Sequence, residues 1–217
     1  IGNLQAYDGN VTVRSADIDL SSGSIEAYSP SSPSSITLVN NDSGQTTYVG
    51  GFVTRTGYHI DGEELYALRA DAVTIETAAA TGSTAPLMVV DSFELSTGDA
   101  NMDLTLRSAG DMEVVGTAIL RGEYSNNILS VDATGDLLMI GMGNALRVES
   151  SATGDAPAGV LNVKANRVIV TGFVGRERLD SATTAEEYEA ALARSEEGPP
   201  SDGSLFADTM NITVTEA

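Results

Sequence analysis

Residues Leu161–Gly172 read Leu-Asn-Val-Lys-Ala-Asn-Arg-Val-Ile-Val-Thr-Gly, and this stretch decides the predicted fold. Apolar residues alternate with polar ones on both sides of a corner of two or three residues. Alternation with a period of two buries one face of each strand and leaves the other face outside. The corner is too abrupt for a helix, and it carries no Asn-Gly or Asp-Gly pair of the kind that marks a hairpin. The stretch therefore predicts two short strands joined by a sharp corner.

The same strand–corner–strand phrase recurs along the chain. Six further copies, three with the same spacing and three with a longer corner, begin at Leu4, Tyr66, Leu205, Leu104, Leu129 and Ile36. A short unit that repeats with variable loops is typical of a solenoid. Each such unit buries its inner face only by stacking on its neighbours.

We therefore expect an all-β fold, a right-handed parallel β-helix (β-solenoid) of about seven irregular coils with one helical insertion. Residues 1–217 would form a single β-solenoid domain or a segment of a longer one. Residues 176–202 break the pattern, because Thr183 begins a run with a capping residue, early acids and good helix formers, and Gly198-Pro199-Pro200 ends it. The side chains predicted to point inward are Leu4, Val11, Leu68, Val73, Leu106, Met112, Val131, Leu137, Val163, Val168 and Ile212.

Composition excludes several classes of protein. The chain has 217 residues and no cysteine, so it has neither a disulfide framework nor a thiolate metal site. The longest apolar runs, Leu87–Val90 and Leu137–Ile140, are too short to span a membrane. The net charge is −20, from 31 acidic and 11 basic residues, and it opposes binding to nucleic acid or to anionic membranes. The acidity suits either a soluble surface in a salty exterior or carboxylate clusters at corners that bind calcium.

The sequence offers no recognisable catalytic residue. His59 is the only histidine and lies in an expected turn, where a structural role is the usual one. No zinc-protease, serine-hydrolase or nucleotide-binding motif is present. Asp17-Ile18-Asp19 begins like a calcium loop, but the twelfth position is Tyr28 where that loop needs Glu. We therefore expect no enzyme activity and no cofactor, and the metal ligands stay unknown, with calcium at acidic corners as an open alternative.

A resemblance supports this interpretation. Leu104–Gly116 and Leu161–Gly172 resemble repeats of the filamentous-haemagglutinin family of secreted bacterial adhesins, with alternating Leu and Val, a Gly-Asp or Asn corner, and then apolar residues before Gly. The resemblance implies a right-handed parallel β-helix, export to the cell surface, and a long adhesive or scaffolding rod. The extracellular rods of sarcoglycan-type membrane proteins contain similar phrases. Three glycosylation sequons would suit them, and they begin at Asn10, Asn41 and Asn211.

The expected function is that of a non-catalytic structural or adhesive β-solenoid rod of an extracellular or cell-surface protein or fibre. Two alternatives are a rod-like ectodomain of a membrane or matrix complex and a carbohydrate-active lyase or glycosidase, which would need a carboxylate cluster in a groove. Neither end of the sequence offers a helix that would cap a sheet edge. The expected partners are therefore another copy or further coils stacked end to end, with a carbohydrate or a host or neighbouring surface as further candidates. We expect no nucleic acid and no membrane insertion.

Overall fold

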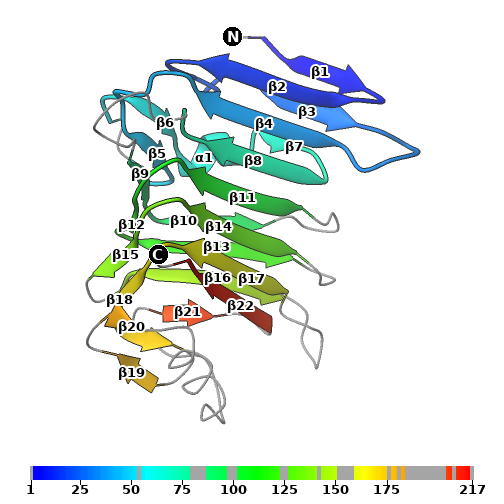
Figure 1. Cartoon of the computed structure of the whole chain (residues 1–217). Helices are drawn as coiled ribbons and strands as arrows, with labels where there is room; N and C mark the ends of the chain where they lie inside the picture. Colours follow the sequence, from blue (N-terminus) through cyan, green and yellow to red (C-terminus); the bar gives the residue numbers. More distant parts are fainter. Residues whose placement is uncertain are drawn as a thin grey trace.

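The chain is mostly β-strand in the computed structural model (Figure 1). The structure describes residues 2–52, 55–78, 87–96, 102–122, 127–140, 143–150, 159–174, 177–179, 182–183, 204–206 and 209–215. Within these ranges one short helix is present, α1 (Gly62–Leu65). None of the described helical residues forms a stretch long and apolar enough to cross a membrane.

The strands form parallel ladders. The three-stranded sheet has the order β1 (Leu4–Tyr7), β3 (Ile25–Tyr28) and β7 (Leu68–Arg69). The seven-stranded sheet has the order β2 (Asn10–Ser15), β4 (Ser35–Asn40), β8 (Ala72–Glu76), β11 (Asp103–Ser108), β14 (Ile128–Ala133), β17 (Val160–Ala165) and β22 (Thr209–Val214).

A third, twelve-stranded sheet joins two flanks of the molecule through β18. Its main path has the order β10 (Phe93–Ser96), β13 (Thr117–Gly122), β16 (Ala145–Ser150), β21 (Ser204–Phe206), β18 (Val168–Val174), β15 (Leu137–Ile140), β12 (Met112–Val114), β9 (Met88–Val90), β5 (Thr47–Val49) and β6 (Tyr58–Ile60). Two further strands pair antiparallel with β18, and they are β19 (Glu177–Leu179) and β20 (Ala182–Thr183).

The predicted right-handed parallel β-helix of about seven irregular coils is wrong, because the strands form separate parallel sheets. The repeated phrase does not mark an equivalent corner in each copy. At Leu4 it joins the three-stranded sheet to the seven-stranded one, whereas at Leu104 it leads from the seven-stranded sheet to the twelve-stranded one. At Leu205 it leads in the opposite direction. Alternation identifies the buried face of a strand, but it does not identify the sheet that the strand joins.

The predicted helical insertion within residues 176–202 is not tested by the described residues and stays a prediction. Thr183, expected to cap a helix, lies in β20 and pairs with Val168. Residues 184–203, where most of the predicted helix falls, lie outside the described residues. The helix α1 lies elsewhere because Asp61 and Glu64 form a capping box, in which each side chain accepts a hydrogen bond from the other residue's backbone N–H.

The core consists of apolar side chains stacked in register along the seven-stranded sheet. Each inward residue lies beside its register partner on the next strand, and burial is lower at the ends of the columns. The first column contains Val11, Ile36, Val73, Leu104, Leu129, Leu161 and Met210. The second contains Val13, Leu38, Ile75, Leu106, Val131, Val163 and Ile212.

Most of the side chains predicted to point inward are buried. Ile212 is only partly buried, and the prediction for Leu4 is wrong, because its strand β1 is an edge of the three-stranded sheet and the side chain is 47% exposed. The predictions that the structure confirms are Val11, Leu68, Val73, Leu106, Met112, Val131, Leu137, Val163 and Val168.

The column packing predicts the effect of a cavity at its centre. Leu106 is fully buried between Ile75 and Val131, so Leu106→Ala is expected to lower the free energy of unfolding by about 2–5 kcal/mol. The matched control is Thr105→Ala on the outward face of the same strand, with an expected change within about 0.5 kcal/mol. Urea denaturation measures both values, and equal losses for the two variants would contradict the stacked core.

Candidate functional site

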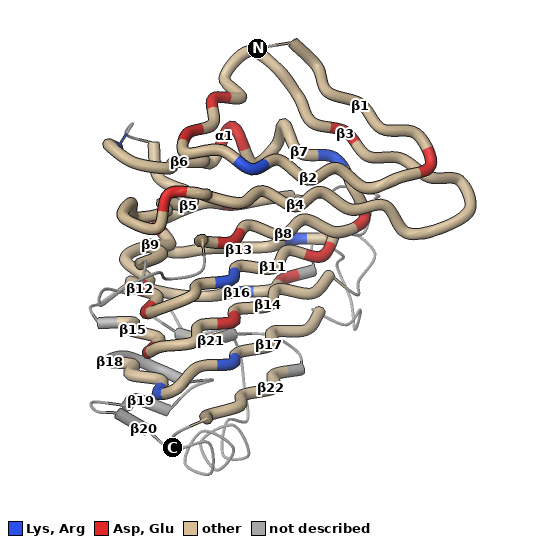
Figure 2. The backbone as a smooth tube through the Cα atoms, turned by 45° about the horizontal axis from the view of Figure 1, so that its top comes forward, with Lys and Arg blue, Asp and Glu red and all other residues tan. Residues whose placement is uncertain are grey.

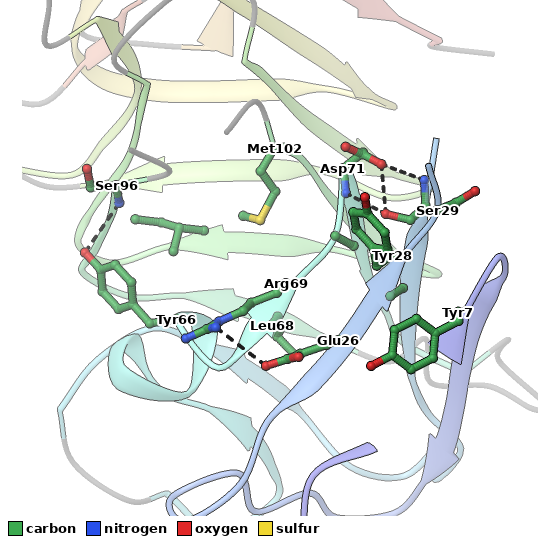
Figure 3. A pocket seen from close by; sticks show the side chains of 14 residues that line it. Tyr7, Glu26, Tyr28, Ser29, Tyr66, Leu68, Arg69, Asp71, Ser96 and Met102 are labelled. Carbon is green, nitrogen blue, oxygen red and sulfur yellow. Dashed lines mark hydrogen bonds and ion pairs between the residues drawn. The ribbon is translucent and has the colours of Figure 1, made fainter. Parts of the chain in front are cut away.

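A groove lies between strands β7 and β10, which are not hydrogen-bonded to each other. Strand β7 pairs with β3 at the end of the three-stranded sheet, whereas β10 pairs with β13 at the end of the twelve-stranded sheet. Residues of both β7 and β10 line a hollow of about 840 Å³ between them. The groove therefore lies at a break between two sheets (Figure 3).

Three tyrosines form the walls of the groove. Tyr7 on β1 and Tyr28 on β3 are register partners, and their side chains are 76% and 61% exposed. Neighbouring parallel strands lie about 4.8 Å apart, so the two rings belong to one surface. Tyr66, on the opposite wall, is 49% exposed. Its hydroxyl donates to the carbonyl oxygen of Glu94 and accepts from the N–H of Ser96, which ties this wall to β10.

The floor of the groove is apolar. It contains the buried side chains of Ala27, Leu68, Leu95 and Met102, which also belong to the hydrophobic core. Because the floor is continuous with the core, its shape is set by the packing of β3, β7 and β10. A ligand in the groove would therefore meet a largely preformed surface.

An ion pair crosses the outer face of β3 and β7 within the groove. Glu26 and Arg69 are register partners, and their charged groups lie 3.6 Å apart. Glu26 also accepts hydrogen bonds from the Gln5 side chain at 2.8 Å and from the Ser24 hydroxyl at 3.3 Å. These contacts hold the carboxylate in place, while the Arg69 side chain is 73% exposed and can turn its guanidinium toward a ligand.

Asp71 and Asp103 line a second hollow of about 480 Å³ beside the groove, and Asp71 also lines the groove itself. The N–H and the hydroxyl of Ser34 donate to the Asp71 carboxylate at 2.7 and 2.8 Å and lower its pKa. Burial raises the pKa of Asp103, although the N–H of Ile128 donates to its carboxylate at 3.1 Å. The charge of Asp71 raises the pKa of Asp103 further. The two carboxyl groups therefore differ in their affinity for a proton.

Outward-facing charges also stack in register (Figure 2). On the seven-stranded sheet, Arg107 lies 3.4 Å from Glu76 and 3.6 Å from Asp132, and Lys164 lies 3.7 Å from Asp132. Exposed pairs of this kind contribute about 0–1 kcal/mol each, so they add little to stability. Opposite charges on neighbouring strands do favour the observed register over one shifted by a residue. We assign this column a structural role.

His59 is buried and lies away from the groove. Its Nε2 lies 2.9 Å from the carbonyl oxygen of Gly50, and its Nδ1 accepts from the N–H of Arg55 at 3.4 Å. Both ring nitrogens thus contact backbone groups, as expected for a structural histidine. Tyr48 packs against it edge to face, with the ring centres 6.2 Å apart.

The acidic residues singled out in the sequence act as local turn acceptors. Asp19 accepts from the N–H and the hydroxyl of Ser21, which lower its pKa, and Asp17 accepts from the N–H of Ile18. Across the described ranges, no three His, Asp or Glu side chains gather as a metal cluster would require. The calcium alternative therefore has no cluster to support it in this part of the chain.

Sequence reasoning missed the tyrosines of the groove. The signal was present in two similar phrases, Leu4-Gln5-Ala6-Tyr7 and Ile25-Glu26-Ala27-Tyr28, each of which ends an alternating strand in tyrosine. An alternating pattern assigns such residues to the outer face, where a single exposed aromatic residue is unremarkable. Only the register of β1 and β3 places Tyr7 beside Tyr28.

Comparisons with protein-family models, with curated proteins and with solved structures gave no match for this chain. The resemblance to filamentous-haemagglutinin repeats therefore depends on the quoted residues alone.

The contacts of Asp71 predict how stability depends on pH. Its folded-state pKa lies below the ordinary value of 3.8, so its hydrogen bonds with Ser34 stabilise the fold above that pH and are lost as the pH falls through the folded-state pKa. Ser34→Ala removes the hydroxyl that donates to Asp71, so it should lower the free energy of unfolding at pH 7. The expected loss is only about 1 kcal/mol, because Asp71 is exposed and solvent weakens the interaction. The cost should shrink in strong acid.

Urea denaturation of both proteins at neutral pH and in strong acid measures this difference. The matched control is Ser32→Ala in the same loop, whose hydroxyl lies 3.1 Å from the hydroxyl of Ser29 and contacts no carboxylate among the described residues. It should change stability little at either pH. A cost of Ser34→Ala that is the same at both pH values would show that the charge of Asp71 is not involved.

Proposed function

We propose that this chain is a non-catalytic structural and adhesive module of an extracellular surface protein or fibre. The observation that carries the proposal is the groove with Tyr7, Tyr28 and Tyr66 on its walls. Exposed large apolar side chains that gather in one place favour an interaction site. Tyrosine suits such a site because its rigid ring offers apolar area and its hydroxyl a hydrogen bond.

The scaffold supports an adhesive role because it holds two of the tyrosines on strands and ties the third to a strand. Tyr7 and Tyr28 project from neighbouring hydrogen-bonded strands, and the hydroxyl of Tyr66 is bound to the backbone of β10. A site on strands is positioned more accurately than a site on loops. Less conformational entropy is then lost when a ligand binds.

Two features support a location outside the cell. The net charge of −20 keeps the surface soluble in a salty medium. The asparagines of the three sequons, Asn10, Asn41 and Asn211, are all exposed and accessible to a glycan. Both features suit a secreted or surface-displayed protein.

The sheet edges support association with another copy or with further strands. Among the described strands, β1 and β2 each lie at one end of their sheet and pair along one side only. The other side of such a strand presents backbone N–H and C=O groups that can pair with an added strand. Stacking through this edge would align the grooves of successive copies along a fibre.

Asp71 and Asp103 favour a second candidate, a carbohydrate-active lyase or glycosidase. Two carboxyl groups whose pKa values are moved in opposite directions are the arrangement used for acid and base catalysis. Both candidates bind a polymer in the same region of the molecule. They differ in whether the bound polymer is cleaved.

An adhesion assay under flow tests the proposal. Beads coated with the full chain are passed over immobilised mucin, collagen, cellulose, chitin and mannan, and we expect attachment to at least one of them. Tyr7→Ala combined with Tyr28→Ala should abolish the attachment, because it removes one wall of the groove. The matched control is Phe52→Ala, which removes an aromatic side chain that is 83% exposed and does not line the groove.

Release of new reducing ends is measured on the same polysaccharides, and none is expected. Failure of wild-type beads to attach to any surface would contradict the adhesive proposal, as would attachment that survives the double substitution. Cleavage that is abolished by Asp103→Asn would establish the enzymatic candidate instead.

A further inference from the structure

The faces of the groove tyrosines are suited to the C–H surfaces of sugar rings. The face of an aromatic ring carries partial negative charge and attracts polarised hydrogen atoms. Tyr7 and Tyr28, as register partners, lie on one wall, and Tyr66 lies on the other (Figure 3). An extended ligand with successive flat, weakly polar faces would contact both walls.

The polar groups of the groove match hydroxyl groups. A hydroxyl both donates and accepts a hydrogen bond, so its site needs acceptors and donors together. The carboxylates of Glu26 and Asp71 are acceptors, and the exposed guanidinium of Arg69 is a donor. Carboxylate and guanidinium groups are planar and can form two hydrogen bonds at once, so each can contact two neighbouring hydroxyl groups.

The charges of the groove favour a neutral ligand. Glu26 and Arg69 neutralise each other, which leaves one carboxylate, Asp71, among the charged groups that the described residues contribute to the lining. An anionic polymer would be repelled by this carboxylate and by the net charge of −20. A cationic ligand would meet Arg69, which lies centrally between the tyrosine walls in Figure 3.

A purely aliphatic ligand also fits poorly. It would cover the ion pair of Glu26 and Arg69 and take these groups out of water without offering a hydrogen bond. Covering charged groups in this way costs several kcal/mol unless new hydrogen bonds replace the lost water. The ligand must therefore combine apolar faces with hydroxyl groups.

We infer that the groove between β7 and β10 binds a neutral oligosaccharide, which stacks on Tyr7, Tyr28 and Tyr66 and donates hydrogen bonds to Glu26 and Asp71. This inference rests on the proposed adhesive function and names its ligand class. The break between the two sheets, which interrupts the ladder on this flank, provides the space for the sugar chain.

Tyrosine fluorescence and calorimetry test the inference on the full chain, which has seven tyrosines and no tryptophan. The neutral probes are oligosaccharides of glucose, mannose, galactose and N-acetylglucosamine. Oligogalacturonate and a heparin fragment form the anionic arm, oligolysine the cationic arm, and a proline-rich peptide the protein arm. We expect saturable binding of at least one neutral oligosaccharide and no binding in the other arms.

Tyr28→Ala should weaken that binding about tenfold, because one stacked aromatic contact is lost. Tyr28→Phe keeps the ring and should stay close to the wild type, and Phe52→Ala should leave the affinity unchanged. If Tyr28→Ala does not fold by circular dichroism, Tyr7→Ala replaces it, since that side chain is 76% exposed and lies outside the core.

Three results would overturn the inference: no neutral oligosaccharide binds, binding is equal in wild type and the alanine variants, or only a charged or peptide probe binds. The last result would leave the adhesive function standing, because the groove would still bind a ligand through its tyrosines. If wild-type beads attach to no surface but the protein binds a neutral oligosaccharide in solution, the adhesive function is rejected and the sugar-binding inference is not.

Discussion

In-register stacking of the parallel strands is the constraint on which the rest of the structure depends. Because Val73 pairs with Leu104 and Ile75 pairs with Leu106, every strand of the seven-stranded sheet must present apolar residues at the same two positions. The same register aligns the outward residues, so that Arg107 comes to lie between carboxylates on either side. One geometric rule thus sets the core, the surface charges and the positions of exposed aromatic side chains.

The groove follows from a local failure of that rule. Strand β7 has only two residues, and its ladder ends there, while the next strand on this flank, β10, joins a different sheet. The hydroxyl of Tyr66 bridges the two by binding backbone groups of β10. Because β7 and β10 do not pair, a hollow lies between them. The core stays closed to solvent, since Leu68 and Leu95 are buried on the floor of this hollow. The site and the scaffold therefore have a common origin.

Alternation was enough to find the buried faces of strands such as β11 and β17, because the pattern is local. It could not assign strands to sheets, since pairing joins residues such as Leu106 and Val131 that are distant in the sequence. Helix α1 was missed because four residues show no period, although Asp61 and Glu64 form the spacing of a capping box. The groove could not be predicted either, because it depends on β7 and β10 failing to pair.

The most direct test of the central claim is a disulfide measurement, and the absence of cysteine in the chain makes it clean. Thr74 and Thr105 are register partners, and neighbouring parallel strands lie about 4.8 Å apart, within the range of about 4.4–6.8 Å between Cα atoms that a disulfide bridges. Thr74→Cys with Thr105→Cys should therefore cross-link under mild oxidation, whereas Glu76→Cys with Thr105→Cys, displaced by two residues, should not. Equal cross-linking of the two pairs, or cross-linking of the displaced pair alone, would contradict the register from which the core and the groove have been derived.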